Sequence, residues 1–216
     1  MPNVEPVLRA VKAIKENVAA AEGAGTDLTP TVLVHTTDGV TAAHLGRVDR
    51  LPLATRLRQV VAAFGADYVA FTHEAYLLIG PEGLGLAEGE LARRFAAGDP
   101  NVAEVINVVG LGTDGAGTMV SLPYHYEGRR VVWDPPVRPP DSGGVRLGGL
   151  FPDAVAAGFA DRGRPDWWTA ALRLAAGGIL VQGPHGELVS PEGLPRAEDA
   201  CPCGSGRVYR SCHGRS

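Results

Sequence analysis

Residues 118–133 read Thr-Met-Val-Ser-Leu-Pro-Tyr-His-Tyr-Glu-Gly-Arg-Arg-Val-Val-Trp, two runs rich in β-branched and aromatic residues on either side of Glu127-Gly128. A third run of this kind, from Val102 to Val109, precedes them. Such runs predict β-strands, and the short connections predict that neighbouring strands pair as a meander. The centre of the chain should therefore form a sheet.

Helices and further strands are predicted on both sides of this meander. Residues 4–22 carry apolar side chains at intervals of three and four, which is typical of an amphipathic helix. Similar patterns predict helices over 51–64, 89–97, 152–160 and 165–176, and strands over 31–36, 67–79 and within 179–189. Because these elements intermix without strict alternation, we expect an α+β body with a mixed or antiparallel sheet and packed helices.

The end of the chain differs in composition from the rest. Residues 191–200 are polar and contain prolines, as linkers do, and all three cysteines follow within the last sixteen residues. We therefore expect a body over 1–194, a linker over 195–200 and a small module over 201–216. The chain, with 216 residues, is long enough for one domain with a sizeable core and such a module.

Charge and cysteine content narrow the class of protein. The formal net charge is −4, so the chain lacks the overall basic excess that nucleic-acid binding across a whole domain requires. The first residues do not resemble a secretory signal, and no run of about 18 apolar residues could span a membrane. An odd number of cysteines cannot form a framework of paired disulfides. We expect a soluble protein in a reducing compartment.

The tail combines three thiols with an imidazole. It reads Cys-Pro-Cys-Gly-Ser-Gly-Arg-Val-Tyr-Arg-Ser-Cys-His-Gly over residues 201–214, a C-x-C-x8-C-H spacing. Tetrahedral structural Zn²⁺ takes such ligands, and four protein ligands leave no position for a reactive water. The predicted zinc ligands are Cys201, Cys203, Cys212 and His213. Free thiols in a frayed tail, or a redox pair, are the alternative.

Glycines and arginines of the tail predict its shape and charge. Gly204 and Gly206 permit positive φ directly after Cys203, so that backbone N–H groups can turn toward the thiolates. A segment this short cannot bury enough apolar surface to fold without metal. The module should present a small basic surface, formed by Arg207, Arg210 and Arg215 with Tyr209 beside them.

This tail closely resembles the SEC-C motif, the zinc-binding tail of the preprotein translocase motor SecA. The resemblance covers about fourteen residues and implies that Cys201, Cys203, Cys212 and His213 are the zinc ligands. It also implies a bacterial cytoplasmic protein whose module docks on the chaperone SecB, on the ribosome or on anionic lipid. Translocation is not implied, because the chain is too short for the motor and has no Gly-x-x-x-x-Gly-Lys-[Ser/Thr] phosphate loop.

Polar residues within the predicted sheet form a second candidate site. His73, Glu74, Asp114 and His125 interrupt the central strands, and a histidine near a carboxylate can act in acid–base catalysis or bind a metal. Because the exposed face of a half-buried strand carries such residues anyway, we assign no catalytic residue.

Two further patterns have simpler interpretations. Gly110-Leu-Gly-Thr-Asp-Gly115 fits the Gly-x-Gly-x-x-Gly pattern of dinucleotide-binding loops, but strand-like residues follow it, so we interpret it as a hairpin turn. Trp133, Trp167 and Trp168 could form a binding surface, although tandem tryptophans on a short helix more often contribute to a core.

The leading hypothesis is a non-enzymatic bacterial cytoplasmic protein whose C-terminal zinc knuckle binds a protein partner, such as a chaperone, the ribosome or a translocation component. One alternative is a nucleic-acid binder in which the arginines of the tail contact phosphates and Tyr209 stacks on a base. The other is a small enzyme with its site near His73, Glu74, Asp114 and His125, and with the knuckle as a targeting tag.

Overall fold

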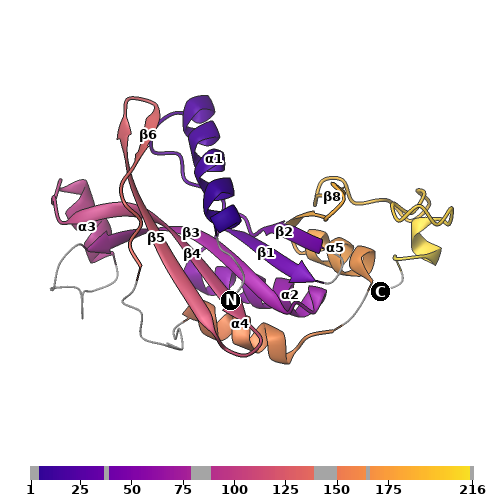
Figure 1. Ribbon diagram of the computed structural model, residues 1–216. Coiled ribbons are helices and arrows are strands. Elements are labelled where there is room, and N and C mark those ends of the chain that lie inside the picture. Colours follow the sequence, from indigo (N-terminus) through magenta and orange to yellow (C-terminus); the bar gives the residue numbers. More distant parts are fainter. Residues whose placement is uncertain (1–4, 37–38, 79–88, 139–149, 164–165, 215–216) are drawn as a thin grey trace. The chain divides into compact units, whose positions relative to one another are not determined.

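A computed structural model describes residues 5–36, 39–78, 89–138, 150–163 and 166–214 (Figure 1). These residues contain five α-helices and eight strands in antiparallel pairing, which confirms the predicted α+β class. The helices are α1 (Glu5–Glu22), α2 (Arg50–Phe64), α3 (Glu90–Ala96), α4 (Leu150–Ala160) and α5 (Trp167–Ala176). The strands are β1 (Thr31–Thr36), β2 (Gly39–His44), β3 (Tyr68–Leu78), β4 (Val102–Gly112), β5 (Gly117–Glu127), β6 (Arg130–Trp133), β7 (Leu180–Gln182) and β8 (Leu188–Val189). None of the helices in these ranges has the length and apolar character that crossing a membrane requires.

The chain divides into two compact units, each assembled from three stretches of sequence. Unit 1 comprises Met1–Pro30, Ala70–Gly110 and Ala116–Val145, and its strands are neighbours in the order β6-β5-β4-β3. In unit 2 the strand order is β1-β2-β7-β8, and the C-terminal tail belongs to this unit. Its stretches are Thr31–Val69, Leu111–Gly115 and Arg146–Ser216.

In unit 1, helix α1 packs beside β6 (Figure 1). Val7 and Val11 are buried, as the apolar periodicity predicted. Trp133 of β6 donates its indole N–H to Glu16 at 2.7 Å, and the ammonium group of Lys12 lies 5.3 Å from the centre of the Trp133 ring. Trp133 is therefore engaged in packing α1 onto the sheet.

The next turn of α1 departs from the sequence pattern. Ile14, which was expected on the apolar face, is 49% exposed, whereas Lys15 is fully buried. The reason is Glu74 of β3, whose carboxylate lies 2.5 Å from the Lys15 ammonium group. A buried charge is tolerated when it is paired in this way. At this turn α1 therefore buries the charged side chain of Lys15, whereas the sequence pattern predicted burial of the apolar side chain of Ile14.

We call Lys15, Glu74, Tyr124, Thr26 and Leu28 the Lys15 cluster. Lys15 also donates to the Thr26 carbonyl at 2.7 Å and lies 4.7 Å from the centre of the Tyr124 ring. Glu74 accepts further hydrogen bonds from the Tyr124 hydroxyl at 2.9 Å and the Leu28 amide at 2.7 Å. Burial lowers the pKa of Lys15, but hydrogen bonding, chiefly with Glu74, outweighs burial and raises this pKa, so the lysine stays charged.

Unit 2 contains a strand, β2, that the sequence analysis missed. β1 and β2 pair antiparallel with Val32 opposite Ala43, and β2 pairs antiparallel with β7, with Ala42 opposite Gln182. The sequence of β2, Gly-Val-Thr-Ala-Ala-His, contains few of the residues that favour strands, which explains the omission. The strand pair predicted within 179–189 is confirmed as β7 and β8.

Helices α2, α4 and α5 pack together with the strands of unit 2. The approach of α4 to α2 is close, because a Cβ atom built at Gly158 would lie 2.7 Å from the Cβ atom of Val61. Trp167 at the start of α5 donates its indole N–H to the Thr41 hydroxyl in β2 at 3.0 Å. Trp167 and Trp168 meet edge to face, with ring centres 5.0 Å apart. Trp167 therefore connects α5 to the sheet.

The glycine-rich segment 110–115 covers the end of β4 and most of the turn that leads to β5. The Gly115 amide donates to the Gly112 carbonyl at 3.0 Å, and Gly115 has a φ of 76°, in the left-handed region that glycine favours. A strand, β5, follows the segment where a dinucleotide-binding loop would lead into a helix. The interpretation as a hairpin turn is confirmed.

Candidate metal centre

Residues 200–214 fold back on themselves, and we call them the knuckle. Ala200 and Val208 form an isolated antiparallel bridge. Between them, Gly204 and Gly206 have φ values of 74° and 72°, the positive values that the sequence predicted. The short 3-10 helix η1 (Tyr209–Ser211) follows and returns the chain toward the start of the knuckle.

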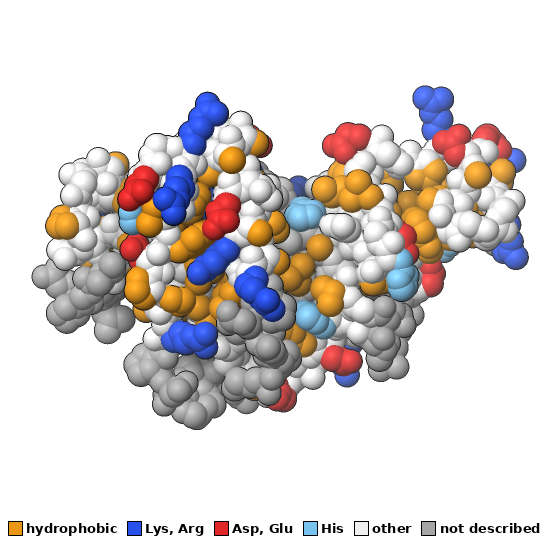
Figure 2. Space-filling model, turned by 45° about the horizontal axis from the view of Figure 1, so that its top comes forward, with side chains coloured by type: hydrophobic (Ala, Val, Ile, Leu, Met, Phe, Trp, Pro, Cys, Tyr) orange, Lys and Arg blue, Asp and Glu red, His pale blue; other side chains and the backbone are white. Residues whose placement is uncertain are grey.

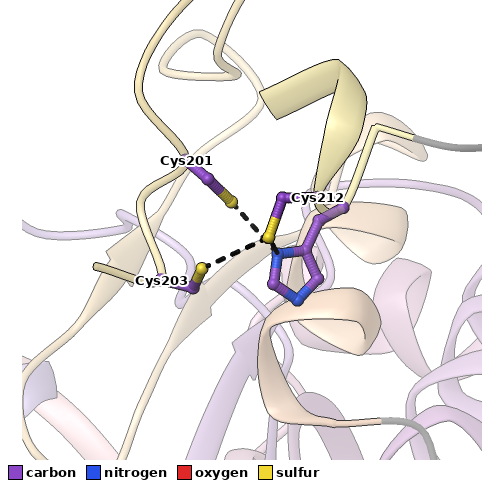
Figure 3. Close-up of side chains that lie close together, drawn as sticks. Cys201, Cys203 and Cys212 are labelled. Carbon is purple, nitrogen blue, oxygen red and sulfur yellow. Dashed lines mark hydrogen bonds between the residues drawn. The ribbon is translucent and has the colours of Figure 1, made fainter. Parts of the chain in front are cut away.

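Three cysteines and one histidine converge inside the knuckle (Figure 3). Nδ1 of His213 lies 3.0 Å from Sγ of Cys201 and 3.3 Å from Sγ of Cys212. The Sγ atoms of Cys203 and Cys212 are 3.7 Å apart, and all three cysteines are free of disulfides. The four donor atoms all lie within 4.8 Å of one another, so this group could hold a metal ion.

The thiols differ in how readily they lose a proton. Burial of Cys201 raises its pKa to about 11, whereas hydrogen bonding with Ser205 lowers the pKa of half-exposed Cys203 to about 6. The Ser205 hydroxyl also lies 3.3 Å from Sγ of Cys212. Because metals bind thiolates and not thiols, a bound cation would favour the deprotonated form of each cysteine.

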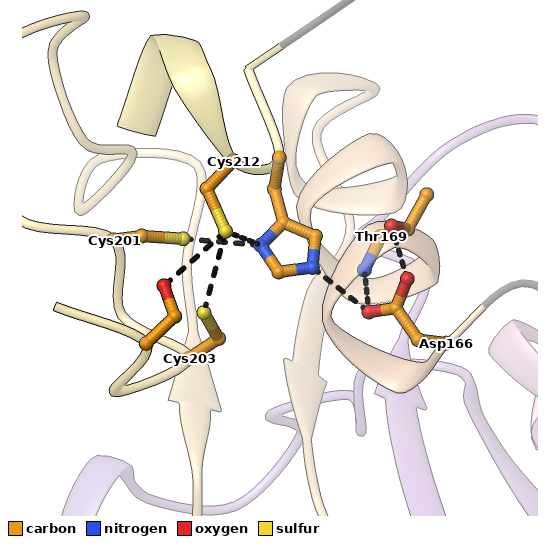
Figure 4. Close-up of polar contacts among 7 residues, drawn as sticks. Asp166, Thr169, Cys201, Cys203 and Cys212 are labelled. Atoms are coloured by element: carbon orange, nitrogen blue, oxygen red, sulfur yellow. Dashed lines mark hydrogen bonds and ion pairs between the residues drawn. The ribbon is translucent and has the colours of Figure 1, made fainter. Parts of the chain in front are cut away.

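A carboxylate outside the knuckle contacts the histidine (Figure 4). Oδ1 of Asp166, the N-cap residue of α5, lies 2.9 Å from Nε2 of His213 and accepts from the Thr169 amide at 3.1 Å. Burial by itself would raise the pKa of Asp166, but the hydrogen bonds from Thr169 and then from His213 lower it. Sequence analysis missed this residue, because Asp-x-x-Thr indicates an N-cap but not a contact with a side chain 47 positions later.

The segment predicted as a linker is hydrogen-bonded to η1. The Tyr209 amide donates to the Asp199 carbonyl at 2.8 Å, and the Arg210 amide donates to the Ala197 carbonyl at 3.0 Å. The guanidinium group of Arg210 also pairs with the carboxylate of Glu198 at 2.7 Å. The backbone approaching the knuckle is thus part of its hydrogen-bond network.

The charge around the knuckle is mixed. Residues 200–214 contain no Asp or Glu, but Figure 2 shows acidic as well as basic side chains at this end of the molecule. Arg207 and Arg210 are both exposed, but the charge of Arg210 is paired with Glu198. Arg215, the third arginine of the predicted basic surface, lies outside the described residues. The described part of this surface is therefore less basic than the sequence suggested.

Within the second candidate site, Glu74 and His125 contact different residues. Glu74 belongs to the Lys15 cluster, whereas Nδ1 of His125 lies 3.5 Å from a carboxylate oxygen of Asp134. The ring of His73 stacks on the ring of Phe71, with ring centres 5.1 Å apart. Asp114 is a residue of unit 2, whereas the other three belong to unit 1. Glu74 and His125 therefore have separate partners.

A pocket in unit 2 lies next to α2 and α5. Its lining includes Gln59, Ala63, Arg173, Leu174 and Ile179. None of His73, Glu74, Asp114 and His125 lines this pocket. The pocket therefore gives the enzyme alternative no support.

Comparison with known proteins bears on the tail. The family model of the SEC-C motif matches residues 199–215, which include all four converging side chains. No curated protein and no solved structure matches the chain. The predicted resemblance is confirmed: the chain carries a SEC-C motif at residues 199–215.

Proposed function

We propose that the knuckle is a structural zinc site that serves as a docking module for a protein partner in the bacterial cytoplasm. The observation that carries the proposal is the convergence of three Sγ atoms and one imidazole nitrogen within 4.8 Å. The proposed zinc ligands are Cys201, Cys203, Cys212 and His213. The resemblance to SEC-C tails supports the assignment to a bacterial cytoplasm, where thiols stay reduced.

The donor set and its spacing support zinc over other metals. When Zn–S bonds are near 2.3 Å, two sulfur atoms of a tetrahedral site are about 3.8 Å apart. The Sγ atoms of Cys203 and Cys212 are 3.7 Å apart, which fits this geometry. Three thiolates and an imidazole complete the coordination, so that the metal would hold the knuckle together and would not activate a water molecule.

The charge of the knuckle favours a protein partner over a nucleic acid. Binding to phosphates requires several basic groups together, but the described knuckle has only two arginines, Arg207 and Arg210, and Arg210 contacts Glu198. A metal-ordered surface with few basic groups suits a protein partner better. The resemblance to the SEC-C motif points to a chaperone, the ribosome or a translocation component as the partner.

The experiment uses the full chain and two variants. Cys203→Ser removes one proposed ligand, and Arg207→Gln removes a charge from the same loop while leaving all four donors in place. Zinc content is measured by elemental mass spectrometry, and partners are captured from a bacterial lysate with and without nuclease. We expect one zinc ion per chain in the wild type and in Arg207→Gln, and loss of zinc and of the captured protein in Cys203→Ser.

Three outcomes would contradict the proposal at different points. A wild-type chain that is purified and reconstituted without taking up zinc would exclude the metal site. Capture that survives Cys203→Ser would show that the knuckle is not the docking surface. Capture that is lost on nuclease treatment and in Arg207→Gln would favour the nucleic-acid alternative.

A further inference from the structure

We propose that Asp166 anchors the zinc site to helix α5, so that metal binding in the knuckle is coupled to the fold of unit 2. The inference rests on the proposed zinc site. It concerns a residue that lies outside the SEC-C motif, 33 positions before the start of the match at residue 199. It makes the knuckle a part of unit 2 that responds to metal, where the sequence predicted a separate module.

The position of Asp166 joins two structures through one carboxylate. Oδ1 contacts Nε2 of His213 at 2.9 Å and the amide of Thr169 at 3.1 Å, while Oδ2 accepts from the Thr169 hydroxyl at 2.6 Å (Figure 4). Thr169 thereby fixes the orientation of the carboxylate. The side chain of His213 is only 13% exposed, whereas that of Asp166 is 60% exposed, so the contact is made by a shielded imidazole and a carboxylate that solvent also reaches.

The two nitrogens of His213 face different groups. Nδ1 points toward Sγ of Cys201 and Cys212, at 3.0 and 3.3 Å, where a metal would be bound. For Nδ1 to be a ligand, the ring proton must sit on Nε2, and Nε2 is the atom that faces Asp166. A carboxylate in this position holds the histidine in the ligating tautomer and orientation, and the loss of such a partner weakens metal affinity by about 10- to 100-fold.

Helix α5 is a firm support for this contact. Ala170, Ala171 and Leu174 are buried in unit 2, and Trp167 is hydrogen-bonded to Thr41 of β2. The proposed metal site is therefore connected, through the contact of His213 with Asp166, to the first turn of helix α5. Ordering of His213 by zinc should slow hydrogen exchange at the amides of this turn.

The test compares zinc affinity in full-length wild type and Asp166→Ser by competition with a chromophoric chelator. Serine is a good N-cap residue, so the variant preserves the start of α5, but its short side chain does not reach His213. We expect zinc binding to weaken by about 10- to 100-fold, and zinc to lose its protecting effect on the α5 amides in hydrogen exchange. An unchanged affinity would overturn the proposal.

A second background separates anchoring from a general effect on the fold. His213→Cys keeps four zinc ligands but removes the nitrogen that contacts Asp166. In this background Asp166→Ser should leave zinc affinity unchanged. An equal loss of affinity in both backgrounds would show that Asp166 acts only through the helix, which overturns the anchoring role. If the wild type bound no zinc, the proposed function would be wrong as well. An unchanged affinity in Asp166→Ser, or an equal loss of affinity in both backgrounds, would contradict only the anchoring role.

Discussion

The Lys15 cluster predicts a large stability cost for a single substitution. Lys15→Met keeps an unbranched side chain of similar length but removes the positive charge next to Glu74. In the folded protein the Lys15 side chain is 0% exposed and that of Glu74 is 11% exposed, so water cannot replace the lost partner well. The carboxylate would then be a buried charge without its counter-ion.

The expected magnitude follows from what Glu74 retains. Breaking a buried ion pair by removing one partner costs about 3–5 kcal/mol of unfolding free energy. Because Glu74 still accepts hydrogen bonds from Leu28 and Tyr124, we expect the lower end, about 3 kcal/mol. For a chain of this size each kcal/mol lowers Tm by about 2–4 °C, so Tm should fall by about 6–12 °C.

The assay is denaturant unfolding of zinc-loaded protein, followed by circular dichroism. Lys12→Met is the matched control, because Lys12 lies one turn earlier on α1 and is only half-buried, so its loss should cost under about 1 kcal/mol. Lys15→Met/Glu74→Gln removes both charges and should be more stable than Lys15→Met. A loss below about 1 kcal/mol in Lys15→Met, the value of an exposed pair, would refute the reasoning.

Three more predictions concern the knuckle and the core of unit 2. Removal of zinc by a chelator should abolish hydrogen-exchange protection in residues 201–214, and unchanged protection would contradict a metal-dependent knuckle. Zinc affinity should fall progressively as the pH drops, because protons compete with the metal for the thiolates and burial raises the pKa of Cys201 to about 11; chelator competition that shows no fall across pH would contradict thiolate ligation. Gly158→Leu should destabilise the protein by about 1–3 kcal/mol, because the α2–α4 contact has no room for a side chain. The exposed control Ala156→Leu on the same helix should change stability by under about 0.5 kcal/mol, and equal effects in thermal melts would argue against close packing.

Local signals predicted most of the fold. The apolar periodicity of α1 and α2 and the β-rich runs of β3 to β6 are visible within a few residues of chain, and the structure has these elements. The inward position of Lys15 was not visible, because its partner Glu74 lies 59 positions away in the chain. Strand β2 was missed for a related reason: it is held by pairing with β1 and β7, while its own residues favour strands only weakly.

The same distinction applies to the candidate site. Cys201, Cys203, Cys212 and His213 lie within 13 residues of each other, so their spacing alone predicted the convergence that the structure shows. Asp166 comes from a helix much earlier in the chain, and only tertiary packing brings it to His213. A sequence motif thus identified the four side chains that converge but not the carboxylate that contacts one of them.

The pairing of β2 with β7 has a consequence for folding during synthesis. The strand that contains Ala42 can pair along both edges only after Gln182, 140 residues later, has been synthesised. At about 5–20 residues per second, the ribosome needs about 7–28 s to supply that partner. Until then the edge of the β1–β2 hairpin is open to strands of other nascent chains, and such edges promote aggregation. A nascent chain of this protein should therefore be most vulnerable to misassembly while the residues between the two strands are being translated.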